Sequence, residues 1–332
     1  MSRCLLLLLA ATLLFASCGT APPNRRSAVD ELTHQIGTLP GVVAAKYSFG
    51  DGGPTGPAYF EIDVDVAADI TGDQAAAIAS RYVDGLETVD YSGYAAEFDA
   101  RRGGNVFTIG GLSVTGRDRV LAQARSWVAL RQRFPGSTVA LRAAEPPVGR
   151  IDLTDDADYA AAGAAVITLG SSFGELVAGD WTVRAGKRHP AEIHTARRVP
   201  TPQEMDVWHR VNADQSIPHA DVLMVNNTNT APVWLSEKIP AENPGMAVQL
   251  ALQHLPVVAA LRPPVLYTAS NQYRGHIGYF GQATGPVTVT LGGCTKRSYR
   301  PEPAEQALID RYERCPRPVG MSRSREDQEP PR

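Results

Sequence analysis

The segment Ala58–Ala67, AYFEIDVDVA, decides the fold of this chain, because its side chains alternate between apolar and acidic. The even-numbered positions from Phe60 to Val66 are apolar, and the odd-numbered positions from Glu61 to Asp65 are acidic. A period of two is the spacing of a β-strand with one buried and one solvated face. The sequence around this segment is therefore expected to build a sheet that is covered on one side.

Helices are predicted on both sides of this strand. Val29–Leu39 is helix-like and ends at Pro40-Gly41, after which VVAAKYSF at 42–49 predicts a first strand. Thr71–Leu86 is rich in alanine, and Thr71 or Asp73 can cap its N-terminus. Two further strands are predicted at 93–100 and 105–114.

The same order of elements recurs twice along the chain. The helix Arg117–Phe134 begins a second copy and again ends at a Pro-Gly pair, Pro135-Gly136, and the helix Pro202–Val211 begins a third. Pro256 should kink the second helix of this third copy. The remaining expected elements are helices from Asp155 and at Met246–Leu261, and strands at 137–143, 149–154, 179–186, 219–225, 232–238, 263–270, 275–282 and 287–293.

This pattern predicts an α+β fold of three repeated units, each with the order helix-strand-strand-helix-strand over roughly 70 to 90 residues. We expect helices on one face of mostly antiparallel sheets. The element order resembles ferredoxin-like modules, including the small BON-type units of bacterial envelope proteins. The expected segments are a signal peptide (1–17), a flexible tether (18–27), modules at 28–115, 116–187 and 201–316, a linker (188–200) and a disordered tail (317–332).

The N-terminal segment predicts export and lipid attachment. Arg3 precedes an uncharged apolar run from Cys4 to Phe15, which is shorter than the ~20 residues of a membrane span. Ala16-Ser17-Cys18 then places small residues before a cysteine, which resembles the lipobox of bacterial lipoproteins cleaved by signal peptidase II. The resemblance implies diacylglycerol on Cys18 and a body held on the extracytoplasmic face of the cell membrane. An ordinary signal peptide with an incidental cysteine is the alternative.

The remaining cysteines predict a disulfide bond. Cys4 leaves with the signal peptide and Cys18 takes the lipid, so Cys294 and Cys315 remain. An exported compartment is oxidising, and neither a CxxC spacing nor a nearby histidine suggests a metal or redox pair. The bridge would hold the last expected helix, Pro303–Arg314, to the body of the protein.

Composition and charge exclude several classes of function. Hydrophobic residues make up 43% and charged residues 20% of the chain, which is typical of a globular protein. The net charge of −3 gives no reason to expect a nucleic acid as partner. No P-loop, GxGxxG or zinc-ligand spacing is present, so no cofactor is predicted. The abundance of Ala, Arg and Gly with few Lys resembles lipoproteins of actinobacteria, including mycobacteria.

Gly170–Gly174, GSSFG, matches the G-x-S-x-G pattern of serine hydrolases, which makes Ser172 a candidate nucleophile. The pattern requires a strand before the serine and a helix after it. Here the preceding AAVITL aligns with the end of a helix, and only ELVA separates Gly174 from the next strand. A loop at the C-terminal end of a helix is the preferred interpretation.

Two polar segments are candidate ligand sites. His189, Glu192 and His194 form the densest group of potential metal ligands, with His209 or His219 as a possible third histidine. The i, i+5 spacing and the neighbouring arginines favour an exposed basic linker instead. The loop Asn226–Thr230, NNTNT, could bind a sugar or peptide through its amides, but its composition is also that of an ordinary turn.

The run from Tyr267 to Phe280 is the most binding-like part of the sequence, because tyrosine and arginine offer large contact areas with polar groups. Cross-strand pairs of tyrosine and phenylalanine are the structural alternative. Its aromatic and polar members are Tyr267, Asn271, Gln272, Tyr273, Arg274, His276, Tyr279 and Phe280.

The sequence therefore predicts a membrane-anchored envelope lipoprotein that binds or scaffolds a partner without catalysis. The membrane is expected as one partner, through the lipid on Cys18, and an envelope protein, lipid or glycan as the other. A hydrolase that uses Ser172, and a carrier of a lipid or small ligand, are the alternatives.

Overall fold

The structure is a computed structural model that describes residues 22–52, 56–110, 116–226, 231–278 and 281–315. The chain divides into two compact units, Met1–Arg150 and Ile151–Arg332. The expected signal peptide with Cys18 and the expected tail at 317–332 lie outside the described residues.

Unit 1 alternates helices with pairs of strands. Its α3 begins with the expected cap at Thr71, whose hydroxyl accepts a hydrogen bond from Gln74 N, while the Gln74 side chain accepts one from Thr71 N. The elements are α2 (Arg26–Gly37), β1 (Val42–Gly50), β2 (Ala58–Val66), α3 (Gly72–Thr88), β3 (Tyr94–Arg102), β4 (Asn105–Gly110), α4 (Arg117–Arg133), β5 (Thr138–Ala143) and β6 (Val148–Asp152), which ends across the unit boundary.

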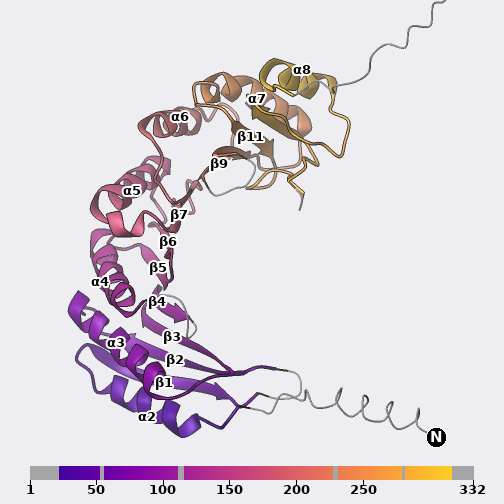
Figure 1. Cartoon of the computed structure of the whole chain (residues 1–332). Helices are drawn as coiled ribbons and strands as arrows, with labels where there is room; N and C mark the ends of the chain where they lie inside the picture. The colour runs from indigo at the N-terminus through magenta and orange to yellow at the C-terminus, as the bar shows by residue number, and fades with distance from the viewer. Residues whose placement is uncertain (1–21, 53–55, 111–115, 227–230, 279–280, 316–332) are drawn as a thin grey trace, which may run out of the picture. The chain divides into compact units, whose positions relative to one another are not determined.

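The strands of unit 1 lie side by side in chain order, and the helices cover one face of the sheet (Figure 1). β1–β2 and β3–β4 pair antiparallel, whereas β2–β3 and β4–β5 pair parallel across α3 and α4. On the covered face, Phe98 contacts Tyr82 of α3, and Phe107 contacts Trp127 of α4. The acidic positions of β2 lie on the other face, as their alternation predicts.

Unit 2 continues the alternation of helices and strand pairs. β7–β8, β9–β10 and β11–β12 pair antiparallel, and β8–β9 and β10–β11 pair parallel across a helix. The elements are α5 (Tyr159–Ser172), a short 3₁₀ helix (Gly174–Leu176), β7 (Asp180–Arg184), β8 (Glu192–Ala196), α6 (Pro202–Ala213), β9 (Ala220–Val225), β10 (Val233–Lys238), α7 (Pro244–Val258), β11 (Val265–Ser270), β12 (Val287–Leu291) and α8 (Pro303–Tyr312).

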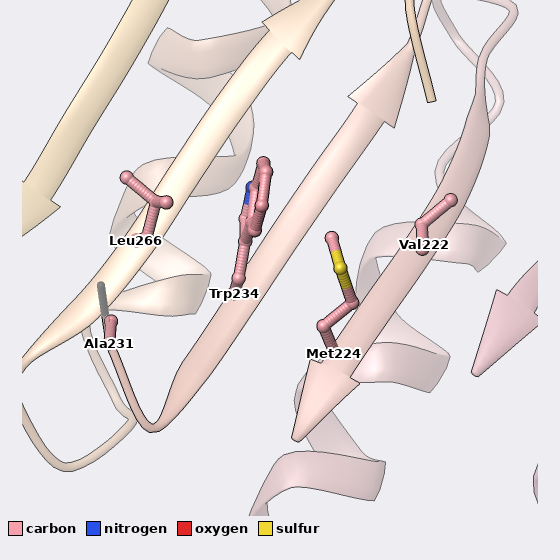
Figure 2. Packing of buried hydrophobic residues seen from close by; sticks show 5 residues of the cluster. All are labelled: Val222, Met224, Ala231, Trp234 and Leu266. Atoms are coloured by element: carbon pink, nitrogen blue, oxygen red, sulfur yellow. The ribbon is translucent and has the colours of Figure 1, made fainter. Parts of the chain in front are cut away.

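The strands β9 to β12 are buried on both faces, unlike those of unit 1. On the face away from α7, Val222, Met224, Trp234 and Leu266 pack together with Ala231, and the side chains of this cluster are drawn in Figure 2. Ile277, from the connection between β11 and β12, packs against them. This connection therefore helps to cover a face that is open to solvent at β2.

The predicted fold of three ferredoxin-like units on mostly antiparallel sheets is wrong. The sheet is mixed, and the repeated element is a helix followed by one antiparallel hairpin. A helix that connects two strands can return the chain parallel to the preceding strand, which gives the parallel pairs between successive repeats. The helices of these repeats start every 42 to 46 residues, at Arg26, Gly72, Arg117, Tyr159, Pro202 and Pro244.

The error in the repeat has a local cause. The Pro-Gly pairs that suggested the period follow α2 and α4 but not α3, so they mark only the first and third of the repeats. Gly41 and Gly136 both adopt a positive φ, of 88° and 78°, which is the conformation that a glycine after a helix supplies. Gly93 does the same after α3 without a preceding proline, at φ 88°. The positive φ of this glycine therefore recurs after α3, although the Pro-Gly sequence does not.

Two local predictions also differ from the structure. Residues 188–200, expected as an exposed linker, contain β8, a mostly buried strand between β7 and β9. The strand expected at 275–282 is absent from its described residues, where only an isolated bridge joins Ile277 to Ala283. The predicted disulfide is confirmed: Cys294 is bonded to Cys315, with their Cα atoms 4.7 Å apart.

Candidate functional site

Two carboxylates lie inside unit 2, on the face of the sheet that α7 covers. Asp221 of β9 and Glu237 of β10 are directly opposite each other in the antiparallel register, and both are 0% exposed. Like charges opposite each other in a sheet destabilise it, and buried charges need partners. The neighbouring groups that can serve as these partners therefore define the candidate site.

Glu237 is held by two neighbours. His254 Nδ1, from α7, lies 2.5 Å from Glu237 Oε1, and the Tyr267 hydroxyl, from β11, donates to Glu237 Oε2. The other ring nitrogen of His254, Nε2, lies 3.5 Å from Asp214 Oδ2, just after α6. Side chains from α7 and β11 thus converge on the Glu237 carboxylate of β10.

Asp221 has fewer hydrogen-bond partners than Glu237 among the described residues. His219 Nε2 lies 3.5 Å from Asp221 Oδ2, yet neither carboxylate oxygen of Asp221 accepts a hydrogen bond. His219 directs its Nδ1 to Ile217 O at 2.6 Å, and Val211 O lies 3.3 Å from its Nε2. The rings of His219 and His254 are 5.2 Å apart.

Burial and mutual charge shift the pKa values in this cluster, which we call the charged core (His219, Asp221, Glu237, His254 and Tyr267). Burial raises the pKa of Glu237 against the opposing effect of the His254 hydrogen bond. Burial alone would lower the pKa of His219, but the carboxylates of Asp221 and Glu237 raise it to about 9. The pKa of His254 is likewise raised against the effect of burial, chiefly by Glu237. Both shifts favour the protonated form of the two histidines beside the acids.

A pocket of about 600 Å³ adjoins the charged core within unit 2. His219 belongs to both: it lines the pocket, while its side chain is 0% exposed and reaches Asp221. The other lining residues come from the start of α5 (Asp156, Asp158, Tyr159), the segment before β8 (Arg188 to Ala191), the end of α6 and beyond (Asn212, Gln215), the ends of β9 and β10 (Pro218, Ala220, Lys238 to Pro240) and Tyr273.

The pocket carries charges of both signs beside aromatic rings. Arg188 pairs with Asp156 at 2.6 Å, and the carboxylate of Asp158 caps α5 by accepting from Ala161 N. Lys238 Nζ lies 4.0 Å from the centre of the Tyr273 ring, a cation–π contact at the edge of the pocket. The wall is thus amphipathic and nearly balanced in charge.

The aromatic run predicted as a binding surface is divided by the structure. Tyr267 is fully buried in the charged core, whereas Tyr273 lines the pocket. Arg274 is exposed, and His276 Nε2 lies 3.0 Å from Asn271 Oδ1. Tyr279 lies outside the described residues, as does most of the loop Asn226–Thr230.

The group His189, Glu192 and His194 is also divided. His189 is exposed and lines the pocket, while His194 is buried on β8. His194 Nε2 lies 2.9 Å from the Glu192 carboxylate, and its Nδ1 lies 3.0 Å from Thr182 Oγ1. Burial would raise the pKa of Glu192, but the hydrogen bond from His194 and the charge of Arg184 lower it. The third histidine considered for this group, His219, instead lies in the charged core.

Ser172 is the last residue of α5 and is exposed. Among the described residues, no hydrogen bond joins its hydroxyl to a histidine or a carboxylate. The strand-to-helix turn of a hydrolase nucleophile is not formed here, because the serine ends a helix.

The charged core was missed by the sequence analysis, although Tyr267 was named as a candidate. Its acids interrupt the apolar runs ADVLMV and VWLSEK, and His254 interrupts the apolar helix α7. A charge in the middle of an otherwise apolar strand or helix is the signal that would have found them.

Comparison with known protein families, with curated proteins and with solved structures found no match for this chain. None of the helices in the described part of the chain is long and apolar enough to span a membrane. The function must therefore be argued from the site itself.

Proposed function

We propose that this chain is a membrane-anchored extracytoplasmic lipoprotein that binds a small envelope glycan in the pocket of unit 2. The observation that carries the proposal is the pocket itself, whose volume of about 600 Å³ lies within the usual range of small-molecule sites. Its lining combines flat apolar surfaces with amides and charges of both signs, rather than one dominant charge.

The lining residues favour a sugar over a lipid or a polyanion. Tyr159 and Tyr273 offer ring faces, and Asn212 and Gln215 offer amides that can hydrogen-bond to hydroxyl groups. Asp156 and Arg188 already neutralise each other, so a strongly charged ligand finds little net attraction there. A lipid chain would need a predominantly apolar cavity, and this pocket is lined in part by charged residues: Asp156, Asp158, Arg188 and Lys238.

Binding fits the site better than catalysis does. A catalytic group must reach the substrate, and the two carboxylates of the charged core, Asp221 and Glu237, are fully buried. The anchor rests on the sequence around Cys18. It places the pocket on the extracytoplasmic side, where cell-wall glycans are available.

Binding is tested with the full-length protein and an array that includes soluble cell-wall oligosaccharides. We expect Tyr273→Ala and Lys238→Ala to weaken binding of the selected sugar by about 10-fold or more, because they remove a ring and its cation at the pocket edge. Tyr59→Ala is the matched control, since it removes an exposed tyrosine of unit 1. Absence of any bound sugar, or binding that both pocket variants leave unchanged, contradicts the proposal.

The anchor is tested separately by Cys18→Ala. We expect the variant to lose both labelling by a radioactive fatty acid and sedimentation with membranes. A variant that keeps both contradicts the lipobox assignment.

A further inference from the structure

The carboxylate of Asp221 is the least explained group in unit 2. It is 0% exposed, and neither of its oxygens accepts a hydrogen bond. A buried carboxylate in this state loses its hydration without replacement, which is expensive. His254 Nε2 is another buried atom of the charged core without a hydrogen bond. These three polar atoms of one cluster have no hydrogen-bond partner among the described residues, which indicates that the cluster holds something besides protein.

The donor atoms of this cluster are close enough to share one ion. One donor atom each from His219, Glu237 and His254 lie within 4.8 Å of one another. Tetrahedral zinc, with ligands at 2.0–2.2 Å, sets neighbouring donors about 3.3 Å apart. The 3.5 Å between His219 Nε2 and Asp221 Oδ2 matches this spacing, and the 2.5 Å between His254 Nδ1 and Glu237 Oε1 requires a small opening.

The histidine rings are already oriented as metal ligands. Histidines that bind metal usually direct their other ring nitrogen to a backbone carbonyl or a carboxylate. His219 directs Nδ1 to Ile217 O at 2.6 Å, while its Nε2 has the longer contact of 3.3 Å to Val211 O, which the ion would replace. His254 places Nε2 at 3.5 Å from the Asp214 carboxylate, which leaves Nδ1. The two nitrogens that remain are those beside Asp221 and Glu237.

We propose that the charged core is a zinc site, with Zn²⁺ held by His219 Nε2, His254 Nδ1 and a carboxylate oxygen of Glu237, whose residues offer donors within 4.8 Å of one another. Asp221 lies outside that group, and its carboxylate would move inward to become the fourth ligand. Two imidazoles exclude the oxygen-preferring ions Mg²⁺ and Ca²⁺ as the natural occupants. Four protein ligands and full burial describe a closed site of the kind that supports a fold. The ion fixes β9, β10 and α7 to one another beside the pocket.

A cluster of ion pairs without metal is the competing explanation. Two cationic histidines would balance the two carboxylates in charge. They would still leave both oxygens of Asp221 without a hydrogen bond from the described residues. Zinc binding accounts for Asp221 directly, because the ion takes the place of the missing donor.

The test is zinc retention by the full-length protein after treatment with EDTA, incubation with ZnCl₂ and extensive dialysis. Elemental analysis should find one zinc per chain, and zinc should raise the Tm of the EDTA-treated protein by about 5 °C or more. His219→Gln and His254→Gln should each lower zinc affinity by more than the roughly 10- to 100-fold that losing an orienting partner costs. Asp214→Asn, which removes such a partner, should fall within that range.

His194→Gln is the matched control, because His194 also pairs with a glutamate, at 2.9 Å, but belongs to no group of metal-ligand donors found among the described residues. It should retain one zinc. Circular dichroism identifies any variant that fails to fold, and Asp221→Asn, close in size to the native residue, is the second variant if the histidine variants do. Wild-type protein without bound zinc, or zinc retained equally by His219→Gln, His254→Gln and Asp221→Asn, overturns the proposal.

Discussion

The strands β1–β3 of unit 1 and β9–β11 of unit 2 have the same pairing pattern, antiparallel and then parallel, but they place their acids on opposite faces of the sheet. In unit 1 the helix-facing positions are apolar, as at Phe98, and the acids lie on the open face. In unit 2 the helix-facing positions include Asp221 and Glu237, while Trp234 lies on the other face, against Ile277. The repeat thus determines which face of the sheet a side chain occupies. The residue type at that position determines whether it belongs to the apolar core or to the candidate site.

The two groups of acids differ in their energetics for the same reason. On the open face of unit 1, Asp63 and Asp99 lie opposite each other, and Arg101 contacts both. Arg101 is 44% exposed, so water and salt screen this arrangement and it contributes little to stability. The charged core is shielded from water, where an unmatched charge is expensive. The first arrangement is therefore tolerant of change and the second is not.

The largest expected effect comes from Glu237→Ala. It leaves the His254 ring and the Tyr267 hydroxyl without their partner, and we expect a loss of about 5 kcal/mol in the free energy of unfolding. Arg101→Ala in unit 1 should cost about 1 kcal/mol or less. Urea unfolding of both variants measures the difference. Equal losses would show that burial does not separate the two clusters.

Trp234→Ala tests whether the second face of β10 is a true core. The indole is 6% exposed and donates to Thr268 Oγ1 at 2.9 Å, so we expect a loss of about 3–4 kcal/mol. Glu97→Ala, on the open face of unit 1, is the counterpart and should stay within about 0.5 kcal/mol. A small effect at Trp234 would mean that the connection between β11 and β12 does not cover this face.

Removal of the disulfide should affect unit 2 alone. Cys294→Ser with Cys315→Ser opens a loop with a sequence separation of 21, worth about 3 kcal/mol in the chain-entropy model. Hydrogen exchange followed by mass spectrometry should accelerate in β12 and α8 and stay unchanged in α2 and α3. Faster exchange spread over both units contradicts this prediction.

The smallest effect compares two capping boxes. Thr71 and Gln74 begin α3, and Thr201 and Glu204 begin α6 in the same way. Burial would raise the pKa of Glu204, but hydrogen bonds from Arg198 and Thr201 lower it. A carboxylate whose pKa is lower in the folded than in the unfolded state stabilises the fold at pH values above its unfolded pKa of about 4.3. This stabilisation is lost as the pH falls through the folded pKa.

Glu204→Gln should therefore destabilise the protein at pH 7 by about 1 kcal/mol. The difference from wild type should shrink as the pH falls below about 4.3 and should vanish below the folded pKa. Urea unfolding across this pH range measures it, and Gln74→Glu serves as the converse variant in unit 1. A difference that is constant with pH would contradict the assigned role of the Glu204 carboxylate.

Local patterns predicted most elements because local physics determines them. The alternation at Ala58–Val66, the cap at Thr71 and the pairing of Cys294 with Cys315 are confirmed. Pairing direction was predicted wrongly, as mostly antiparallel, because helix and strand signals are the same for parallel and antiparallel neighbours. Strand β8 was missed because its flanking arginines suggested a solvated linker.

The site was harder to predict than the fold. Asp221 and Glu237 are 16 residues apart, and His254 follows 17 residues later, so no short motif joins them. They meet only because the hairpin β9–β10 sets the two acids in register and α7 returns over them. The pocket residue Tyr273 was predicted from its chemistry, but its partner Lys238 is distant in sequence.

The most direct test that the buried acids of unit 2 form a metal site is anomalous X-ray scattering at the zinc edge from crystals of the protein grown with ZnCl₂. We expect one strong peak per chain inside unit 2, at about 2.0–2.1 Å from His219 Nε2 and His254 Nδ1. Electron density that defines both histidines in the folded protein, with no anomalous peak between them, would contradict the claim that the buried acids form a metal site.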